Sequence, residues 1–108
     1  MNYKERIKKE IYNLGYNISN KGTWYLIELI EYTCTKDNYM DILKNLEKNA
    51  YPVIADKYDV KLVTVKNDII YATNNMNNTR NIIKKDTYNI RLTPKMVIFQ
   101  TIDLIREI

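Results

Sequence analysis

The spacing of apolar residues predicts that the N-terminal half of the chain is helical. Between residues 3 and 14, apolar side chains recur every three or four positions, and Gly15 follows as a typical C-terminal stop. Residues 23–34 carry a broad apolar face, and residues 37–49 again show helical spacing. We therefore expect three helices here, the first two separated by a loop that contains glycine and asparagine.

The stretch YPVIADKYDVKLVTV (51–65) is harder to interpret, because its second half is rich in β-branched residues. Pro52 suits the first turn of a helix, which predicts a short helix over 52–58. A second helix is predicted over about 61–77, since the apolar positions there keep helical spacing. Asp59 is expected to be the N-cap of this second helix and to tolerate a left-handed conformation in the turn. The apolar stripe of the second helix is Leu62, Val65, Ile69, Ala72 and Met76.

Two helices joined by a tight turn at residues 59–60 make a helix-turn-helix, in which the second helix commonly enters the major groove of DNA. Ala55 is the small residue expected where the two helices approach each other. Asp68 departs from the motif, because that position is often apolar. An ordinary helical hairpin inside a small bundle is the alternative interpretation of the same pattern.

The last part of the chain is predicted to be a polar loop over 77–91 and then a helix over 94–107, with Thr93 as N-cap. This helix is apolar nearly all round, so it must bury more than one face. We expect one apolar stripe of this helix to be buried in the core of the domain. We expect the second stripe to be buried in a homodimer through residues 94–108, unless the N-terminal helix packs over it. The first stripe is Ile98, Ile102 and Ile105, and the second is Val97, Leu104 and Ile108.

Together these patterns predict one all-α domain, residues 1–108, with five to six helices and a central helix-turn-helix. The sequence contains no histidine, only two glycines and the single Cys34, which we expect to be a buried thiol without a catalytic role. We therefore predict no enzyme activity, no metal, no cofactor and no small-molecule substrate. No apolar run approaches the roughly 18 residues of a membrane span, and the N-terminal residues are not expected to form a signal peptide, because no apolar segment follows their basic residues. A cytoplasmic location follows as the expectation, without a membrane partner.

Several short motifs, in the same order, resemble the C-terminal effector domain of the master sporulation response regulator of spore-forming Gram-positive bacteria. The run AYPVIADKYDV is similar to the Leu-Tyr-Pro-x-Ile-Ala-x-x-Tyr signature that precedes the recognition helix of that family. Upstream, KGTWYLIELI resembles its Lys-Gly-aromatic-x-Tyr-Leu helix. The resemblance implies a six-helix DNA-binding domain that regulates transcription. The directly matching residues of the signature are Tyr51, Pro52, Ile54, Ala55, Lys57 and Tyr58.

The chain departs from the family in two ways. Family members carry a phosphoacceptor receiver domain before the effector domain, whereas the first matched segment here starts at Lys21. The expectation is a stand-alone effector without its own phosphorylation switch. The recognition helix has also lost the arginines of the family, because Thr64, Asn67 and Ile70 stand in their places.

This second departure changes the DNA chemistry that the resemblance implies. Arginine reads guanine, whereas asparagine suits adenine and methyl groups suit thymine, so any preferred site is expected to be A·T-rich under the helix. The net charge is +4, from 17 basic and 13 acidic residues. The alternative is a protein-interaction module on the same fold, because the outward face is unusually apolar. The expected base-reading residues are Thr64, Asn67, Ile70 and Tyr71, and the expected phosphate contacts are Lys57, Lys61 and Lys66.

Overall fold

The computed structural model of the chain describes residues 2–84 and 91–107, and every regular element in this part is helical. Six helices have six residues or more, and α4 is a single turn of four residues. The prediction of an all-α fold with five to six helices is therefore confirmed. The elements are α1 (Tyr3–Leu14), α2 (Lys21–Cys34), α3 (Tyr39–Lys44), α4 (Leu46–Asn49), α5 (Tyr51–Tyr58), α6 (Leu62–Lys84) and α7 (Pro94–Arg106).

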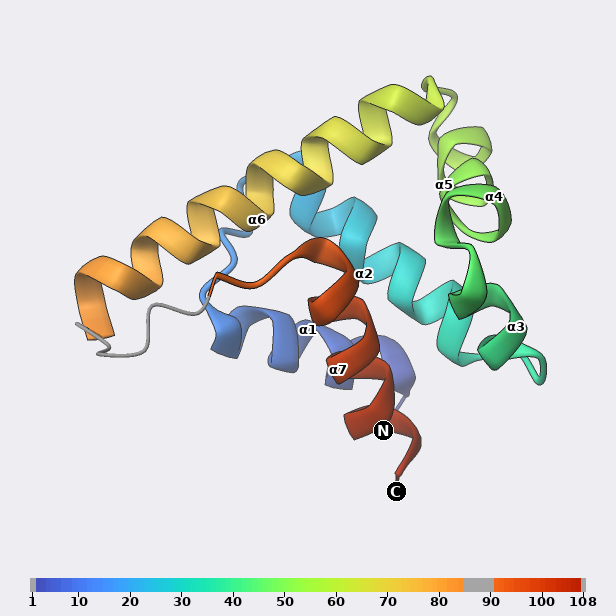
Figure 1. Cartoon of the computed structure of the whole chain (residues 1–108), viewed down its shortest axis with the longest axis horizontal. Coiled ribbons are helices and arrows are strands. Elements are labelled where there is room, and N and C mark those ends of the chain that lie inside the picture. The colour runs from blue at the N-terminus through green and yellow to red at the C-terminus, as the bar shows by residue number, and fades with distance from the viewer. Residues whose placement is uncertain (1, 85–90, 108) are drawn as a thin grey trace.

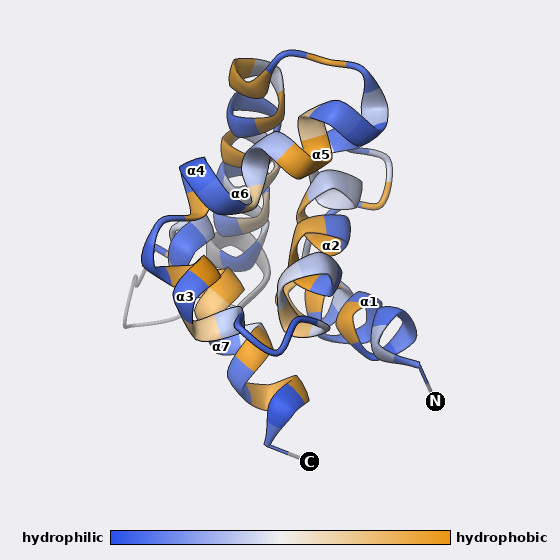
Figure 2. Cartoon of the chain, turned by 90° about the vertical axis from the view of Figure 1, so that its right-hand side faces the viewer, coloured by the Kyte–Doolittle hydropathy of each residue, from blue (hydrophilic) through white to orange (hydrophobic). Residues whose placement is uncertain are grey.

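Helix α2 forms the centre of the domain. It is crossed by α6 on one side and packed by α1 and α7 on the other, while α3, α4 and α5 close one end (Figure 1). The helix is apolar round much of its circumference, which is typical of a buried helix. Apolar residues of α2 accordingly face the inside of the bundle (Figure 2). All of its leucine and isoleucine side chains are completely buried: Leu26, Ile27, Leu29 and Ile30.

Helices α2 and α6 are in close contact at Gly22. A Cβ atom at this position would overlap the backbone carbonyl of Asp68 and would lie 2.9 Å from the backbone nitrogen of Ile69. The two backbones therefore touch, and only glycine leaves room for this contact. Asp68 itself is half-buried, so its position does not require an apolar side chain.

Two of the predicted helix ends are confirmed, at Gly15 and Thr93. Gly15 ends α1 in the left-handed conformation (φ 107°), and its N–H donates to the last carbonyls of that helix. The Thr93 hydroxyl accepts a hydrogen bond from the backbone N–H of Met96 (3.2 Å), as an N-cap should. Among the described residues, no helix combines the length and apolar character needed to cross a membrane.

Three boundaries differ from the prediction. The predicted helix over 37–49 is divided at Asn45, whose side chain caps the one-turn α4 by accepting from the N–H of Lys48 (3.2 Å). Asp59 is the C-cap of α5 and not the N-cap of the next helix, because α6 begins only at Leu62. Residues 77–84, expected to be a loop, continue α6 as a helix, since adding residues to an existing helix needs no new nucleation.

Candidate functional site

A tight turn at residues 59–61 joins α5 to α6 and forms a helix-turn-helix. Asp59 adopts the left-handed conformation (φ 53°), as the sequence predicts. The backbone N–H of the next residue, Val60, donates to the carbonyl of Ala55 (3.0 Å). This bond satisfies a free carbonyl at the end of α5 and turns the chain sharply into α6 (Figure 1). Ala55 is buried, as expected of a small residue between two packed helices.

The predicted base-reading residues lie on the outer side of α6. Val65, Ile69, Ala72 and Met76 are completely buried, so the opposite side of the same turns is left to solvent. Asn67 is exposed, Ile70 is 38% exposed and Tyr71 is 62% exposed. The fourth predicted residue, Thr64, is half-buried at the edge of this surface. The outer face of α6 consists of Val63, Asn67, Ile70, Tyr71 and Asn74.

The three predicted phosphate contacts differ in their freedom to move. The Lys57 ammonium pairs with Glu28 (2.6 Å), and the Lys66 ammonium pairs with Glu47 (2.7 Å). Both partners of the second pair are exposed, so this pair holds Lys66 only weakly. Lys61 is exposed and forms no ion pair within the described part of the chain. Lys61 is therefore the residue best able to contact a phosphate. Lys66 could do so by leaving its weak pair with Glu47, whereas Lys57 is held by Glu28.

Lys57 is held by a buried carboxylate that also binds Lys4. The two Glu28 oxygens accept from Lys4 (2.8 Å) and Lys57 (2.6 Å), and the Glu28 residue is only 7% exposed. Burial alone would raise the pKa of Glu28, but the hydrogen bonds and positive charges of Lys4 and Lys57 together outweigh burial and hold this pKa below its ordinary value. The same hydrogen bond raises the pKa of Lys57. Withdrawing Lys57 toward a phosphate would leave Glu28 with a single cation.

Two basic residues near α6 were not among those predicted from the sequence. The Arg91 guanidinium donates to the side-chain oxygen of Asn74 (3.2 Å) and so lies beside the outer face. Lys21 is exposed at the start of α2, next to the backbone contact between Gly22 and α6. Local periodicity carries no signal for either placement, because Arg91 and Asn74 are 17 residues apart in the chain.

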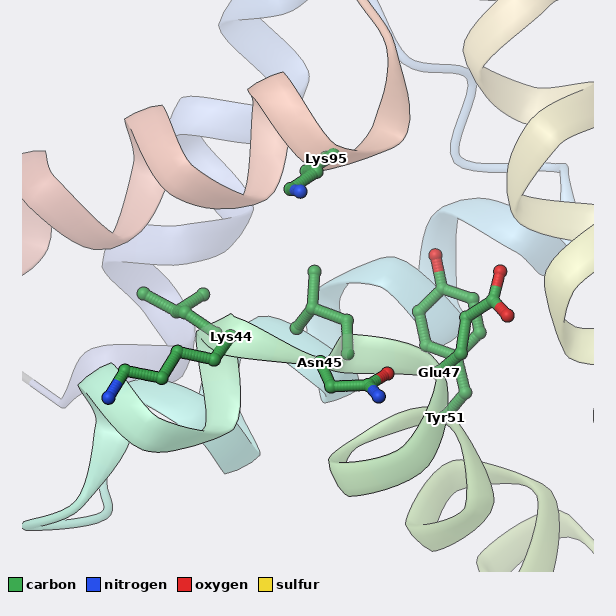
Figure 3. A pocket seen from close by; sticks show the side chains of 7 residues that line it. Lys44, Asn45, Glu47, Tyr51 and Lys95 are labelled. Atoms are coloured by element: carbon green, nitrogen blue, oxygen red, sulfur yellow. The ribbon is translucent and has the colours of Figure 1, made fainter.

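A shallow hollow of about 260 Å³ opens between α4, the start of α5 and the start of α7 (Figure 3). Tyr51 and Glu47 lie on one side of it, Lys95 lies across from them, and Lys44 and Asn45 complete the rim. Burial raises the pKa of Tyr51, so its hydroxyl stays protonated. Glu47 also pairs with Lys66, a predicted phosphate contact on α6. The Glu47 carboxylate therefore lowers the positive potential near the start of α6.

The C-terminal helix buries more of its surface than a single stripe. Ile98, Ile102 and Ile105 are buried as predicted, and Val97 of the second stripe is buried as well. Helix α1 packs against α7, and the guanidinium of Arg6 donates to the carbonyl of Ile105 (3.5 Å). Leu104 remains 43% exposed, whereas Ile108 lies outside the described residues. The second stripe is therefore covered at Val97 and open at Leu104.

The Cys34 thiol is buried, as expected, and burial raises its pKa. In the described ranges, no three carboxylate, thiol or imidazole side chains gather where a metal ion could bind. Comparison with protein-family models, with curated proteins and with solved structures finds no match to the chain.

Proposed function

We propose that this chain is a cytoplasmic, sequence-specific DNA-binding domain that regulates transcription, and not an enzyme. The observation that carries the proposal is the outer face of α6. It is free of other helices over several turns and directly follows the tight turn after α5 (Figure 1). A helix presented in this way fits the major groove of B-DNA.

The positions of the resembling motifs support the same proposal. Pro52 lies in the first turn of α5, Ile54 and Ala55 form its buried side, and the left-handed Asp59 ends it. Gly22, from the upstream motif, is the residue whose missing side chain allows α6 to lie on α2. The signature residues thus have structural roles in presenting α6, which agrees with the proposed resemblance to an effector domain of the sporulation regulators.

The chemistry of the outer face favours A·T-rich DNA. The exposed Asn67 amide has the groups to bond the N6 and N7 positions of adenine, and the methyl groups of Ile70 and Thr64 suit the thymine methyl. Lys61 and Lys66 supply phosphate contacts, while Lys57 stays with Glu28. Because few cations are free, we propose weak binding that depends on salt.

Selection of bound duplexes from a random pool tests this proposal. An enriched A·T-rich site that the full chain retards in a gel, less strongly as salt rises, would support it. Each phosphate contact should contribute about −0.9 to the slope of log K against log salt. Failure to retard any duplex at low salt, or a flat salt response, would contradict it.

A protein-interaction module on the same fold is the second candidate function. Val63 is 53% exposed, and Ile70 and Tyr71 add further apolar area to the outer face. Two of the three expected phosphate contacts are paired with acids of the chain itself. A partner protein would bury this apolar area, so a flat salt response with partner binding through α6 would favour this candidate.

We also propose self-association through α7. Leu104, Met96 and Phe99 leave apolar surface exposed on this helix after α1 and α2 have covered its other sides. The contact with α1 reduces the area available, so the proposed dimer is weak.

A further inference from the structure

An open hollow of about 580 Å³ lies between the start of α1, the first turns of α2 and the end of α5. Its volume falls within the range of small-molecule sites. It lies behind the turn of the helix-turn-helix, whereas the outer face points to solvent. The lining combines three aromatic residues, two lysines and one acid: Trp24, Tyr25, Tyr58, Lys4, Lys21 and Glu28.

The aromatic side chains are held in place before any ligand arrives. The Trp24 indole N–H donates to the carbonyl of Ile18 (2.8 Å), which fixes the orientation of the ring. The rings of Tyr25 and Tyr58 pack with their centroids 5.2 Å apart and their planes inclined at 59°. Trp24 is nevertheless 37% exposed and Tyr58 is 40% exposed. Ordered and partly open aromatic surface of this kind suits the stacking of a flat ligand.

The charge of the lining favours an anion. Both oxygens of Glu28 are occupied by Lys4 and Lys57, so its negative charge is already compensated. Lys21 is exposed at the rim and has no ion pair with any residue that the structure describes. The two lysines of the lining outnumber its single acid, so the hollow has a net positive charge.

A cationic ligand fits this hollow poorly, although aromatic rings around a carboxylate often bind cations. The Lys8 ammonium already lies 5.4 Å from the centre of the Trp24 ring. The Lys57 ammonium lies 5.7 Å from the centre of the Tyr58 ring. Cations of the chain itself therefore already lie beside both rings, and their charge repels a ligand cation.

We propose that this hollow binds a nucleotide, with the base against Trp24 and Tyr58 and the phosphate on Lys21. A flat aromatic group that carries an anion uses both the exposed rings and the uncompensated lysine. The same chemistry is present in a free mononucleotide and in a unit of single-stranded nucleic acid. The proposal does not depend on duplex binding by α6, because the two surfaces use different residues.

Trp24 is the only tryptophan of the chain, so its fluorescence reports directly on this hollow. The full chain is titrated separately with adenosine 5′-monophosphate, adenosine, inorganic phosphate and an oligodeoxyadenylate strand. We expect saturable quenching by the monophosphate, binding of adenosine at least about threefold weaker, and no change with phosphate. Tighter binding of the oligonucleotide than of the monophosphate would assign the site to single strands, and the reverse order would assign it to free nucleotides.

Variants separate this site from general attraction to a basic protein. Lys21→Ala should weaken monophosphate binding about threefold to fivefold, whereas Lys95→Ala, which removes an equal charge on α7, should leave it unchanged. Equilibrium dialysis runs in parallel, so that binding without quenching is also detected. No saturable binding by either method, or equal losses in the two variants, would overturn the proposal. Duplex retardation by the same protein without nucleotide tests the DNA proposal independently.

Discussion

The side chain of Asn77 forms two hydrogen bonds with the backbone of Leu92. Its amide nitrogen donates to the Leu92 carbonyl (2.8 Å), and its oxygen accepts from the Leu92 N–H (2.9 Å). Asn77 is 3% exposed on α6, and Leu92 comes just before α7. One side chain thus supplies both partners of a backbone unit and ties the start of α7 to the middle of α6.

Asn77→Ala should reduce the free energy of unfolding by about 1–3 kcal/mol, because two backbone groups lose their partners. Urea denaturation measures the change. The matched control is Asn78→Ala, which alters the exposed neighbour on the same helix and should stay within about 0.5 kcal/mol of the parent. Equal effects of the two substitutions would show that water replaces the Asn77 contacts at no cost.

Gly22→Ala should destabilise the domain by about 1–3 kcal/mol, although alanine is normally the better helix former. The added methyl group would collide with the backbone of α6 at Asp68. Thermal unfolding measures the loss. Asn13→Ala at an exposed position of α1 is the control and should be neutral or slightly stabilising. A stabilised Gly22→Ala protein would mean that α2 and α6 can move apart freely.

Glu28→Gln should destabilise the domain at neutral pH by about 1–3 kcal/mol, because two charge-assisted hydrogen bonds are lost. The folded pKa of Glu28 is lowered, so its ionised form stabilises the fold fully above the unfolded pKa of about 4.3. This contribution disappears as the pH falls through the lower, folded pKa. The stability difference between parent and variant should therefore shrink on acidification, as denaturant midpoints at several pH values would show. A difference that is constant with pH would exclude this cause.

Asn67→Ala should weaken binding to the selected duplex by about 1–3 kcal/mol and should change binding to random DNA little. The reason is that a base contact carries sequence information, whereas a phosphate contact does not. Retardation of both duplexes measures the two affinities, with Asn13→Ala as control. Equal losses on both duplexes would place Asn67 at the DNA backbone.

Leu104→Lys should shift the chain toward the monomer in sedimentation at high micromolar concentration, because it puts a charge on the open part of the second α7 stripe. Asp103→Asn, at the exposed neighbouring position, changes the net charge by the same one unit and controls for it. A parent chain that is already monomeric, and is unaltered by Leu104→Lys, would show that the contact between α1 and α7 is enough to cover this helix.

The sequence by itself determined the features that depend on neighbours along the chain. The predicted apolar stripe gave the helix and, from Val65 to Met76, the side it buries, because 3.6 residues per turn bring such positions together. Its first residue, Leu62, is 37% exposed, because it lies at the open start of α6. The left-handed Asp59 and the cap at Thr93 were likewise predictable, since they depend on side-chain size and a bond three residues away. The all-α class follows from the same local signals.

Only the tertiary structure decided which groups meet across the domain. The pair between Lys57 and Glu28 joins residues 29 positions apart, and it holds a predicted phosphate contact beside a buried carboxylate. The composition predicted that Asn77 begins a loop, whereas this residue lies on α6 and its buried side chain bonds the backbone of Leu92. Periodicity reports which side of a helix is buried, whereas the partner of a buried polar group depends on how distant helices cross. That crossing is set by close contacts such as the one between Gly22 and Asp68.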